Sequence, residues 1–159
     1  MNTETAALPV EQDDGCILLS FRPGPEDDLQ ALDPATPLTA SLVALWHGSR
    51  CLMVLNRFHH GWELPGGMIE PGESARQAAF RELAEESGQH PDVLEFAGTA
   101  VSWYEPAKRR EHLAIYRGHV QTPEPFTPNE EMSQATWWCP DDALPGLMPI
   151  DAALARLAG

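Results

Sequence analysis

Three glutamates are spaced so that a single helix face would present all of them. Glu82, Glu85 and Glu86 occupy positions i, i+3 and i+4 of the segment RELAEESG, and side chains at this spacing lie on one face of a helix. Like charges at that spacing repel each other and weaken a helix by roughly a few tenths of a kcal/mol per pair. The face is therefore either simply solvated or arranged to hold a cation.

The loop before this segment favours a cation. Gly66, Gly67 and Gly72 allow the backbone to turn sharply and to approach a ligand closely. Carboxylate oxygens are hard ligands that suit Mg²⁺ or Mn²⁺ rather than zinc or copper, and Mg²⁺ is usually held by a few carboxylates together with substrate phosphates. Loop and helix together predict a phosphate compound that binds through a divalent cation.

The same residues resemble the Nudix box, whose pattern is G-x5-E-x7-R-E-U-x-E-E-x-G-U, with U a bulky apolar residue. Residues 67–89 match this pattern at Gly67, Glu73, Arg81, Glu82, Leu83, Glu85, Glu86 and Gly88. The final apolar position holds Gln89 instead. Because that position is a packing site, the difference does not bear on the chemistry. The match at the other positions argues against a merely solvated acidic face.

The resemblance implies a fold of the α/β class, a Nudix-type α/β/α sandwich with a mixed sheet. It also implies an enzyme, a pyrophosphohydrolase acting on acid anhydrides, that uses Mg²⁺ (or Mn²⁺) to cleave a nucleoside diphosphate linked to another group. In such a site the metal ligands are the carboxylates of Glu82, Glu85 and Glu86 and the carbonyl of Gly67. Glu73 pairs with Arg81 and stiffens the loop.

Members of the family often take a base, or one further metal ligand, from a late loop. The segment PNEEMSQ offers Glu130 and Glu131, and we prefer Glu131, although a solvated loop fits both residues as well. In other members a box glutamate, here Glu82, does this work. The expected catalytic residues are therefore Glu82, Glu86, Arg81 and Glu131.

Three further side chains could contact the substrate. Arg57 and Arg109 could bind phosphate, and Trp62 could stack on a base. The alternatives are a solvated arginine at a strand end, a charged hairpin tip and a tryptophan that packs the loop, and for Trp62 we favour packing. The identity of the substrate is open, because Tyr104 suggests dinucleoside polyphosphates while Pro106 suggests ADP-ribose.

We take ADP-ribose or another nucleotide sugar as the first choice. The alternatives are a nucleoside triphosphate pyrophosphohydrolase that cleans the nucleotide pool, and a non-catalytic domain that senses a nucleotide. A structural Ca²⁺ site would not require Gly67 and Arg81 at these spacings. The partner is in every case a small nucleotide, and residues 1–38 could also pair with a second copy to give a homodimer.

Composition narrows the class of protein. The chain has 159 residues, 43% of them hydrophobic, and a net charge of −14, which suits one compact domain and disfavours long nucleic acids. Cys16, Cys51 and Cys139 are odd in number and far apart, so no disulfide framework is expected. Neither a signal peptide nor an apolar run long enough for a membrane is evident. The expected location is the cytoplasm.

The elements that must position these residues follow from local patterns. A helix is predicted over 75–87, because Ser74 and Gln77 form a capping box and Gly88 suits the position after the last turn. Strands are predicted over 16–21, 39–58 (two strands with a turn near residue 48), 95–105, 111–120 and 135–140, and a last helix over 149–159. Residues 22–37, 59–74 and 121–134 are predicted loops. We divide the chain into an N-terminal extension with one strand, residues 1–38, and a Nudix domain, residues 39–159.

Overall fold

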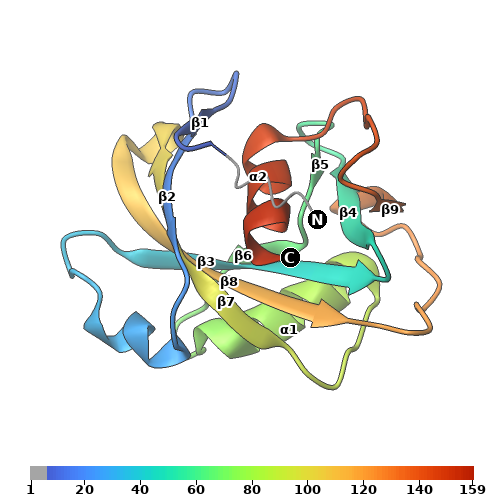
Figure 1. Cartoon of the computed structure of the whole chain (residues 1–159), viewed down its shortest axis with the longest axis horizontal. Coiled ribbons are helices and arrows are strands. Elements are labelled where there is room, and N and C mark those ends of the chain that lie inside the picture. Colours follow the sequence, from blue (N-terminus) through green and yellow to red (C-terminus); the bar gives the residue numbers. More distant parts are fainter. Residues whose placement is uncertain (1–6) are drawn as a thin grey trace.

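A mixed sheet crosses the molecule, with one long helix on each of its faces (Figure 1). The structure is a computed structural model that describes residues 7–159. Its strands are β1 (Val10–Glu11), β2 (Ile17–Arg22), β3 (Leu38–His47), β4 (Arg50–Asn56), β5 (Trp62–Glu63), β6 (Gly66–Met68), β7 (Glu95–Tyr104), β8 (Arg109–His119) and β9 (Met132–Trp138). Its helices are α1 (Ala75–Ser87) and α2 (Pro149–Ala158), with short 3₁₀ turns η1 (Glu26–Ala31) and η2 (Glu105–Ala107).

Strand β3 is the branch point of the sheet. One of its edges pairs in parallel with β8, from Leu38 opposite His112 to Trp46 opposite His119. Its other edge is shared, because β6 pairs with residues 40–42 and β4 pairs only with residues 46–47. The sheet order is β1-β2-β7-β8-β3-β4-β5, and β9 pairs with β4. Since the other pairings are antiparallel, the predicted mixed sheet is confirmed.

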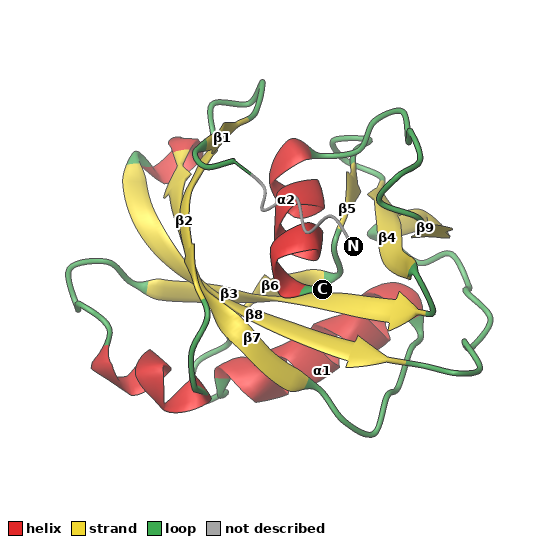
Figure 2. Ribbon diagram, viewed as in Figure 1, coloured by secondary structure: helices red, strands yellow, loops and turns green. Residues whose placement is uncertain are grey.

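Alternate side chains of β3 build two separate cores. Val43 and Leu45 pack into the core that includes Leu83 of α1. Ala44 and Trp46 pack into the core that includes most of α2. Successive side chains of a strand point to opposite faces, so a strand covered by a helix on both faces has to be apolar throughout. This arrangement, seen in Figure 2 as red helices on either side of the yellow sheet, is the predicted α/β/α sandwich.

Helix α1 begins and ends where the sequence predicted. The backbone N–H of Gln77 donates to Ser74 Oγ at 3.0 Å, and the Ser74 N–H donates to Gln77 Oε1 at 2.8 Å, which completes the capping box. At the other end Gly88 has a φ of 74° and donates its N–H to the carbonyl of Ala84. A left-handed residue at this place is favourable for glycine. The helix therefore ends at Ser87, with Gly88 as its C-cap.

Three predicted loops contain secondary structure, and these predictions were wrong in detail. Residues 59–74 contain β5 and β6, residues 22–37 contain η1, and β9 begins at Met132 within the predicted loop 121–134. The density of Gly and Pro hid β6, which forms because it lies beside β3. A Cβ on Gly66 would lie 2.3 Å from the carbonyl oxygen of Ser41, so only glycine lets the two backbones approach this closely.

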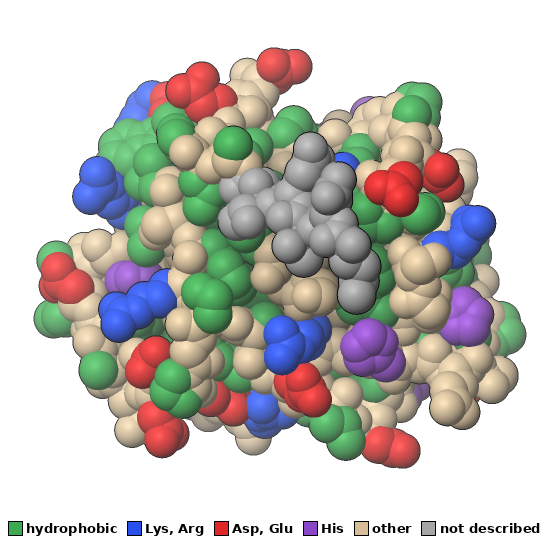
Figure 3. All heavy atoms as spheres, viewed as in Figure 1, with side chains coloured by type: hydrophobic (Ala, Val, Ile, Leu, Met, Phe, Trp, Pro, Cys, Tyr) green, Lys and Arg blue, Asp and Glu red, His purple; other side chains and the backbone are tan. Residues whose placement is uncertain are grey.

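The segment before β3 contributes β1 and β2 to the same sheet, with β2 pairing to β7. The division into an extension and a domain at residue 38 stays a prediction. Within residues 7–159 no helix is long and apolar enough to cross a membrane. On the face drawn in Figure 3, Lys and Arg side chains lie in separate places rather than in one broad patch. The cysteines Cys16, Cys51 and Cys139 are all unpaired thiols.

Candidate active site

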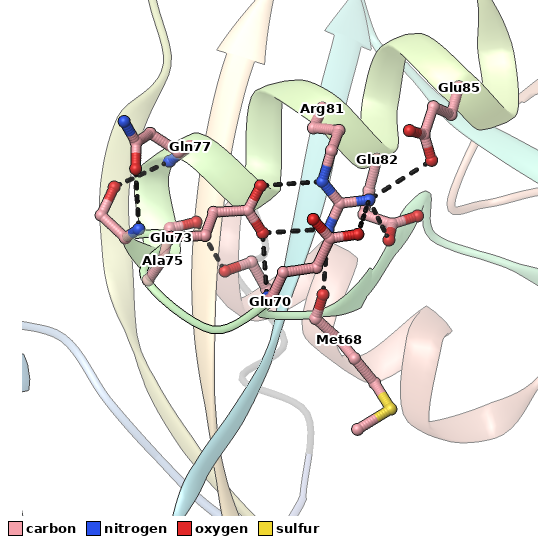
Figure 4. Close-up of polar contacts among 10 residues, drawn as sticks. Met68, Glu70, Glu73, Ala75, Gln77, Arg81, Glu82 and Glu85 are labelled. Carbon is pink, nitrogen blue, oxygen red and sulfur yellow. Dashed lines mark hydrogen bonds and ion pairs between the residues drawn. The ribbon is translucent and has the colours of Figure 1, made fainter.

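Arg81 is the centre of a network that joins the loop 68–73 to α1 (Figure 4). Its guanidinium donates to both carboxylate oxygens of Glu73, at 2.8 and 3.0 Å, and to the carbonyl of Met68 at 3.0 Å. A planar guanidinium suits such a two-point contact with a carboxylate. The hydrogen bond from Arg81 holds the pKa of Glu73 below its usual range. The network closes the loop against the helix, as the box resemblance implied.

The same guanidinium also faces the acidic side of the helix. Arg81 Nη1 lies 2.8 Å from Glu82 Oε1, 3.3 Å from Glu85 Oε2 and 3.8 Å from Glu70 Oε1. The pKa of Arg81 is raised, first by its hydrogen bond to Glu73 and then by Glu82. One cation thus serves four carboxylates, so it cannot neutralise all of the negative charge gathered here.

Glu86 lies deepest in this acidic group. Its side chain accepts a hydrogen bond from the Gly66 N–H at 2.8 Å, and the residue is only 3% exposed. Burial raises the pKa of its carboxyl to about 9, and the nearby charges of Glu63, Glu82 and Glu131 act in the same direction. A buried group under such repulsion is poised either to hold a proton or to bind a cation.

Glu82 lies directly against the backbone of Gly67. A Cβ built on Gly67 would be 2.6 Å from both Cδ and Oε1 of Glu82. Burial raises the pKa of Glu82, and the charges of Glu85 and Glu131 add to the effect, while Arg81 opposes it. The first glycine of the box is therefore required for space, since any side chain would displace this carboxylate.

Two acidic residues outside the box extend this group. Burial raises the pKa of Glu63, although Asn56 donates to it at 3.0 Å and His59 pairs with it at 3.1 Å. Burial likewise raises the pKa of Asp151 to about 8, with the charge of Glu63 as the next cause. Asp151 accepts the Leu64 N–H at 2.9 Å. A row of carboxyls that repel one another thus runs from Asp151 through Glu63 to Glu86, of which Glu86 is the most buried.

The loop before β9 brings one of its two glutamates to this row. Glu131 acts electrostatically on Glu63, Glu82 and Glu86. Glu130, its neighbour, is not among the charges that act on those residues. The role of Glu131 as a base or a further metal ligand stays a prediction.

Comparison with known proteins identifies the family. A family model described as the NUDIX domain matches residues 36–157. The chain belongs to the Nudix family. It is accordingly a pyrophosphohydrolase, an enzyme that acts on acid anhydrides. The sequence-based recognition of the family is confirmed, and so is its fold.

A curated relative and several solved structures resemble this Nudix enzyme. A Bacillus subtilis protein named "Putative 8-oxo-dGTP diphosphatase" is 27% identical over 111 residues, which span 70% of this chain and 68% of the relative. The Bacillus subtilis pyrophosphohydrolase BsRppH has a TM-score of 0.68 at 18% identity, covering 95% of this chain and 96% of that one. The NUDIX domain of Shewanella oneidensis NrtR, crystallised with ADP ribose, has a TM-score of 0.66 at 24% identity, covering 85% and 97%.

Nudix enzymes generally use divalent metals, and the carboxylates of this chain fit such an ion. Burial raises the pKa of Glu86 and of Glu82, and neighbouring carboxylates raise both values further. A bound cation would relieve the repulsion among these carboxylates. The carboxylate of Glu82 occupies the space that a side chain at position 67 would need. Among residues 7–159, however, no three acidic, His or Cys side chains already converge on one point. Glu85 points to Arg81 instead, so it joins the others only by leaving that contact.

The three predicted substrate contacts have different surroundings. Arg57 Nε donates to the carbonyl of Asn129 at 2.7 Å, so this guanidinium is engaged with the late loop. Trp62 packs against the core around α2, and its backbone bonds to Gly146 and Met148. Arg109 lies at the exposed start of β8, 3.4 Å from Glu111. Contact of these residues with a nucleotide stays a prediction.

Sequence reasoning missed Glu63, Asp151 and Asn129. Glu63 could have been noticed as a charge between the apolar residues Trp62 and Leu64. Asp151 resembles an ordinary acidic residue in the first turn of a helix, where negative charge is favourable in any case. The contact of Asn129 with α1 has no local signal, because the carbonyls it binds lie more than forty residues earlier.

Proposed function

We propose that this Nudix enzyme cleaves a pyrophosphate bond in a nucleoside diphosphate linked to another group, with Mg²⁺ or Mn²⁺ as cofactor. The carboxylates of Glu82, Glu85 and Glu86 and the carbonyl of Gly67 would hold the ion. The observation that carries the proposal is the buried carboxylate of Glu86, which accepts the Gly66 N–H at 2.8 Å beside other carboxylates. Burial, and then the charges of Glu63, Glu82 and Glu131, raise its pKa to about 9. Such crowding costs stability unless the site binds positive charge.

The residues have distinct tasks in this reaction. A bound divalent ion supplies positive charge to the bridging phosphates and makes water a better nucleophile. Glu131 orients one water and accepts its proton as the new P–O bond forms. The bond from phosphorus to the bridging oxygen breaks, and the second phosphate leaves with that bonding pair. Arg81 and Glu73 keep the loop closed, so that the Gly67 carbonyl and Glu82 stay together.

Two classes of substrate are candidates, and they differ in the group attached to the nucleotide. A nucleotide sugar such as ADP-ribose is the first choice drawn from the sequence, where Pro106 favours it and Tyr104 favours dinucleoside polyphosphates. The Bacillus subtilis relative, by its name, favours a nucleoside triphosphate such as 8-oxo-dGTP. The two classes differ in their products, because ADP-ribose yields AMP and ribose 5-phosphate while a triphosphate yields a monophosphate and pyrophosphate.

A nucleotide panel with Mg²⁺ tests the proposal and separates the candidates. Released AMP or pyrophosphate identifies the class, and Glu86→Gln should abolish turnover. Glu95→Gln is the matched control, because Glu95 is an exposed carboxylate on β7 that pairs with Arg117 of β8. A folded protein that binds nucleotides tightly and cleaves none of them would instead be a sensor. Light scattering on the same preparation tests the predicted homodimer.

A further inference from the structure

The loop that carries Glu131 is bound to the end of α1 by two side chains. This loop runs from Val120 to Glu131, between β8 and β9. A loop of that length without secondary structure is usually mobile unless specific contacts hold it. Here the contacts come from Gln89, just after α1, and from Asn129 within the loop.

Gln89 binds the main chain of the loop at two points. Its Nε2 donates to the carbonyl of Glu124 at 2.8 Å, and its Oε1 accepts the Glu124 N–H at 3.0 Å. This reciprocal pair resembles one rung of a β-ladder. The residue is only 3% exposed, and it occupies the position at which the box pattern has an apolar residue. The departure from the pattern thus gives the loop a polar anchor.

Asn129 joins the helix end to Glu131 directly. Its Nδ2 donates to the carbonyls of Glu86 and Glu85, at 3.1 and 3.3 Å. These carbonyls lie in the last turn of α1, where no donor within the helix is available. Its Oδ1 accepts the N–H groups of Glu131 and Met132, at 3.0 and 2.9 Å. A single amide therefore links the helix turn that carries Glu86 to the backbone of Glu131.

Arg57, the residue after β4, completes this set of contacts. Its N–H donates to the carbonyl of Glu131 at 2.8 Å, and its Nε donates to the carbonyl of Asn129 at 2.7 Å. The main chain of Glu131 is thus bonded on its N–H side by Asn129 and on its carbonyl side by Arg57. Nothing in this set of contacts requires a bound substrate.

We propose that Gln89 and Asn129 are positioning residues that fix Glu131 relative to Glu82 and Glu86 before substrate binds. The inference rests on the proposed role of Glu131 in orienting the attacking water. Because Glu85 and Glu86 share the turn to which Asn129 bonds, the metal side and the water side of the site move together. The loop is a pre-organised wall of the site rather than a lid that closes on the substrate.

Steady-state kinetics with Mg²⁺ and the best substrate of the panel provide the first test. Asn129→Ala should lower kcat at least tenfold with KM changed less than about twofold, because a displacement of about 1 Å can cost a hundredfold in rate. Gln89→Leu, which restores the apolar residue of the box, should lower kcat about threefold, since its anchor lies further from Glu131. Asp33→Ala is the matched control. Asp33 Oδ1 accepts the N–H of Ala35, two residues on, at 2.9 Å in a different loop. The variant therefore removes a similar contact and should leave kcat unchanged.

Asn129→Asp separates the two halves of the Asn129 contact. The carboxylate keeps an acceptor for the N–H groups of Glu131 and Met132 but has no donor for the helix carbonyls. It also places negative charge at the helix C-terminus, which is unfavourable. The proposal expects a loss of kcat close to that of Asn129→Ala. A variant with wild-type kcat would show that the tie to α1 has no positioning role.

Hydrogen exchange and Mg²⁺ titration give readouts that do not depend on activity. In Asn129→Ala the amides of Glu131 and Met132 should exchange at least about tenfold faster, because their acceptor is gone, while the amides of α1 keep their protection. The affinity for Mg²⁺ alone should stay within about twofold of the wild type, because the carboxylates of α1 are untouched.

The outcomes distinguish this inference from the proposed function. Wild-type protein without turnover on any nucleotide refutes the proposed function, and Glu131→Gln with unchanged kcat refutes the role of Glu131. If Glu131→Gln lowers kcat about a hundredfold, as loss of a general base does, while Asn129→Ala and Gln89→Leu leave kcat at the wild-type value, then the positioning inference alone is wrong. A rise in KM with unchanged kcat in Asn129→Ala would overturn it as well, because that result marks a binding role.

Discussion

Replacing Gly67 with alanine should impair metal binding far more than it impairs folding. The φ of Gly67 is not among the left-handed values found at other glycines of the described chain, so alanine can adopt this backbone. The three atoms nearest to the added methyl group all belong to Glu82, with Cδ and Oε1 at 2.6 Å and Oε2 at 2.9 Å. These atoms form the end of a flexible side chain. Glu82 can therefore rotate away, and the carboxylate leaves its place beside the loop.

The cost in stability follows from the contact that the rotation breaks. Glu82 would lose its hydrogen bond to Arg81 Nη1, which measures 2.8 Å at a site 12% exposed. A hydrogen bond to a charged group contributes about 1.5–3 kcal/mol. Alanine recovers about 0.4–1 kcal/mol by restricting the unfolded chain. We expect the free energy of unfolding to fall by about 1–2 kcal/mol.

The cost in function should be larger. If Glu82 is a metal ligand, its displacement removes one carboxylate from the site, and even changes in the groups around ligands typically weaken metal affinity by about 10–100-fold. Gly48→Ala is the matched control, because Gly48 has a φ of 59° and no atom within 4 Å of its added Cβ. Strain alone should cost that variant about 1–2 kcal/mol, with no change in metal affinity.

Two measurements decide the matter. Urea unfolding in EDTA, followed by tryptophan fluorescence, gives the stability of both variants. Calorimetric titration with Mg²⁺ gives the affinity, and kcat as a function of Mg²⁺ concentration gives the functional effect. Equal losses of stability, with an affinity loss only in Gly67→Ala, are the expected result. Wild-type Mg²⁺ affinity and kcat in a folded Gly67→Ala protein would refute the assignment of Glu82 as a ligand held beside Gly67.

Three further outcomes are expected. In EDTA the free energy of unfolding should fall as the pH rises from about 4.5 toward about 9, because Glu86 keeps in the folded state a proton that the unfolded chain releases at its ordinary pKa of 4.5. Glu86 alone contributes at most about 1.4 kcal/mol per pH unit to this slope. Urea midpoints at three pH values measure the slope, and saturating Mg²⁺ should flatten it. Burial also raises the pKa of Asp151, to about 8, so Asp151 contributes its own part of the slope below pH 8. Asp151→Asn should remove that part, and an unchanged slope would contradict the raised pKa of this carboxyl. Glu26→Gln weakens the contacts of Glu26 with Arg76 and Tyr116. It should lower the free energy of unfolding by about 1 kcal/mol, a small value because the ion pair is partly exposed to solvent. In steady-state assays kcat should stay at the wild-type value.

Local signals were sufficient to predict α1 and the box, because their determinants lie within one stretch of chain. Ser74, Gln77 and Gly88 fix both ends of the helix through contacts at most four residues away. The pairing of Glu73 with Arg81 likewise joins residues eight positions apart. A pattern read along the sequence contains all of this information.

Tertiary contacts decided the features that the sequence did not reveal. β6 is extended because β3 supplies its hydrogen bonds, and η1 lies where Arg76 and Tyr116 bind Glu26. The partner of each element is distant in sequence, so glycine and proline content gave the wrong prediction for both. The raised pKa values of Glu63 and Asp151 belong to the same class, because burial is a property of the assembled fold.

Gln89 shows how a departure from a family pattern can have a physical meaning of its own. An apolar residue there would leave the N–H and carbonyl of Glu124 without these partners, whereas the buried amide bonds to both. The Gln89 amide is itself buried, and an unpaired buried polar group costs about 1–3 kcal/mol, so the path of the late loop has to supply its partners. Helix α1 thus carries the box carboxylates on one face, the Arg81 network at the loop side, and the anchors of the late loop at its end. Because these three groups share one rigid element, a change that shifts α1 would disturb the metal ligands and Glu131 together.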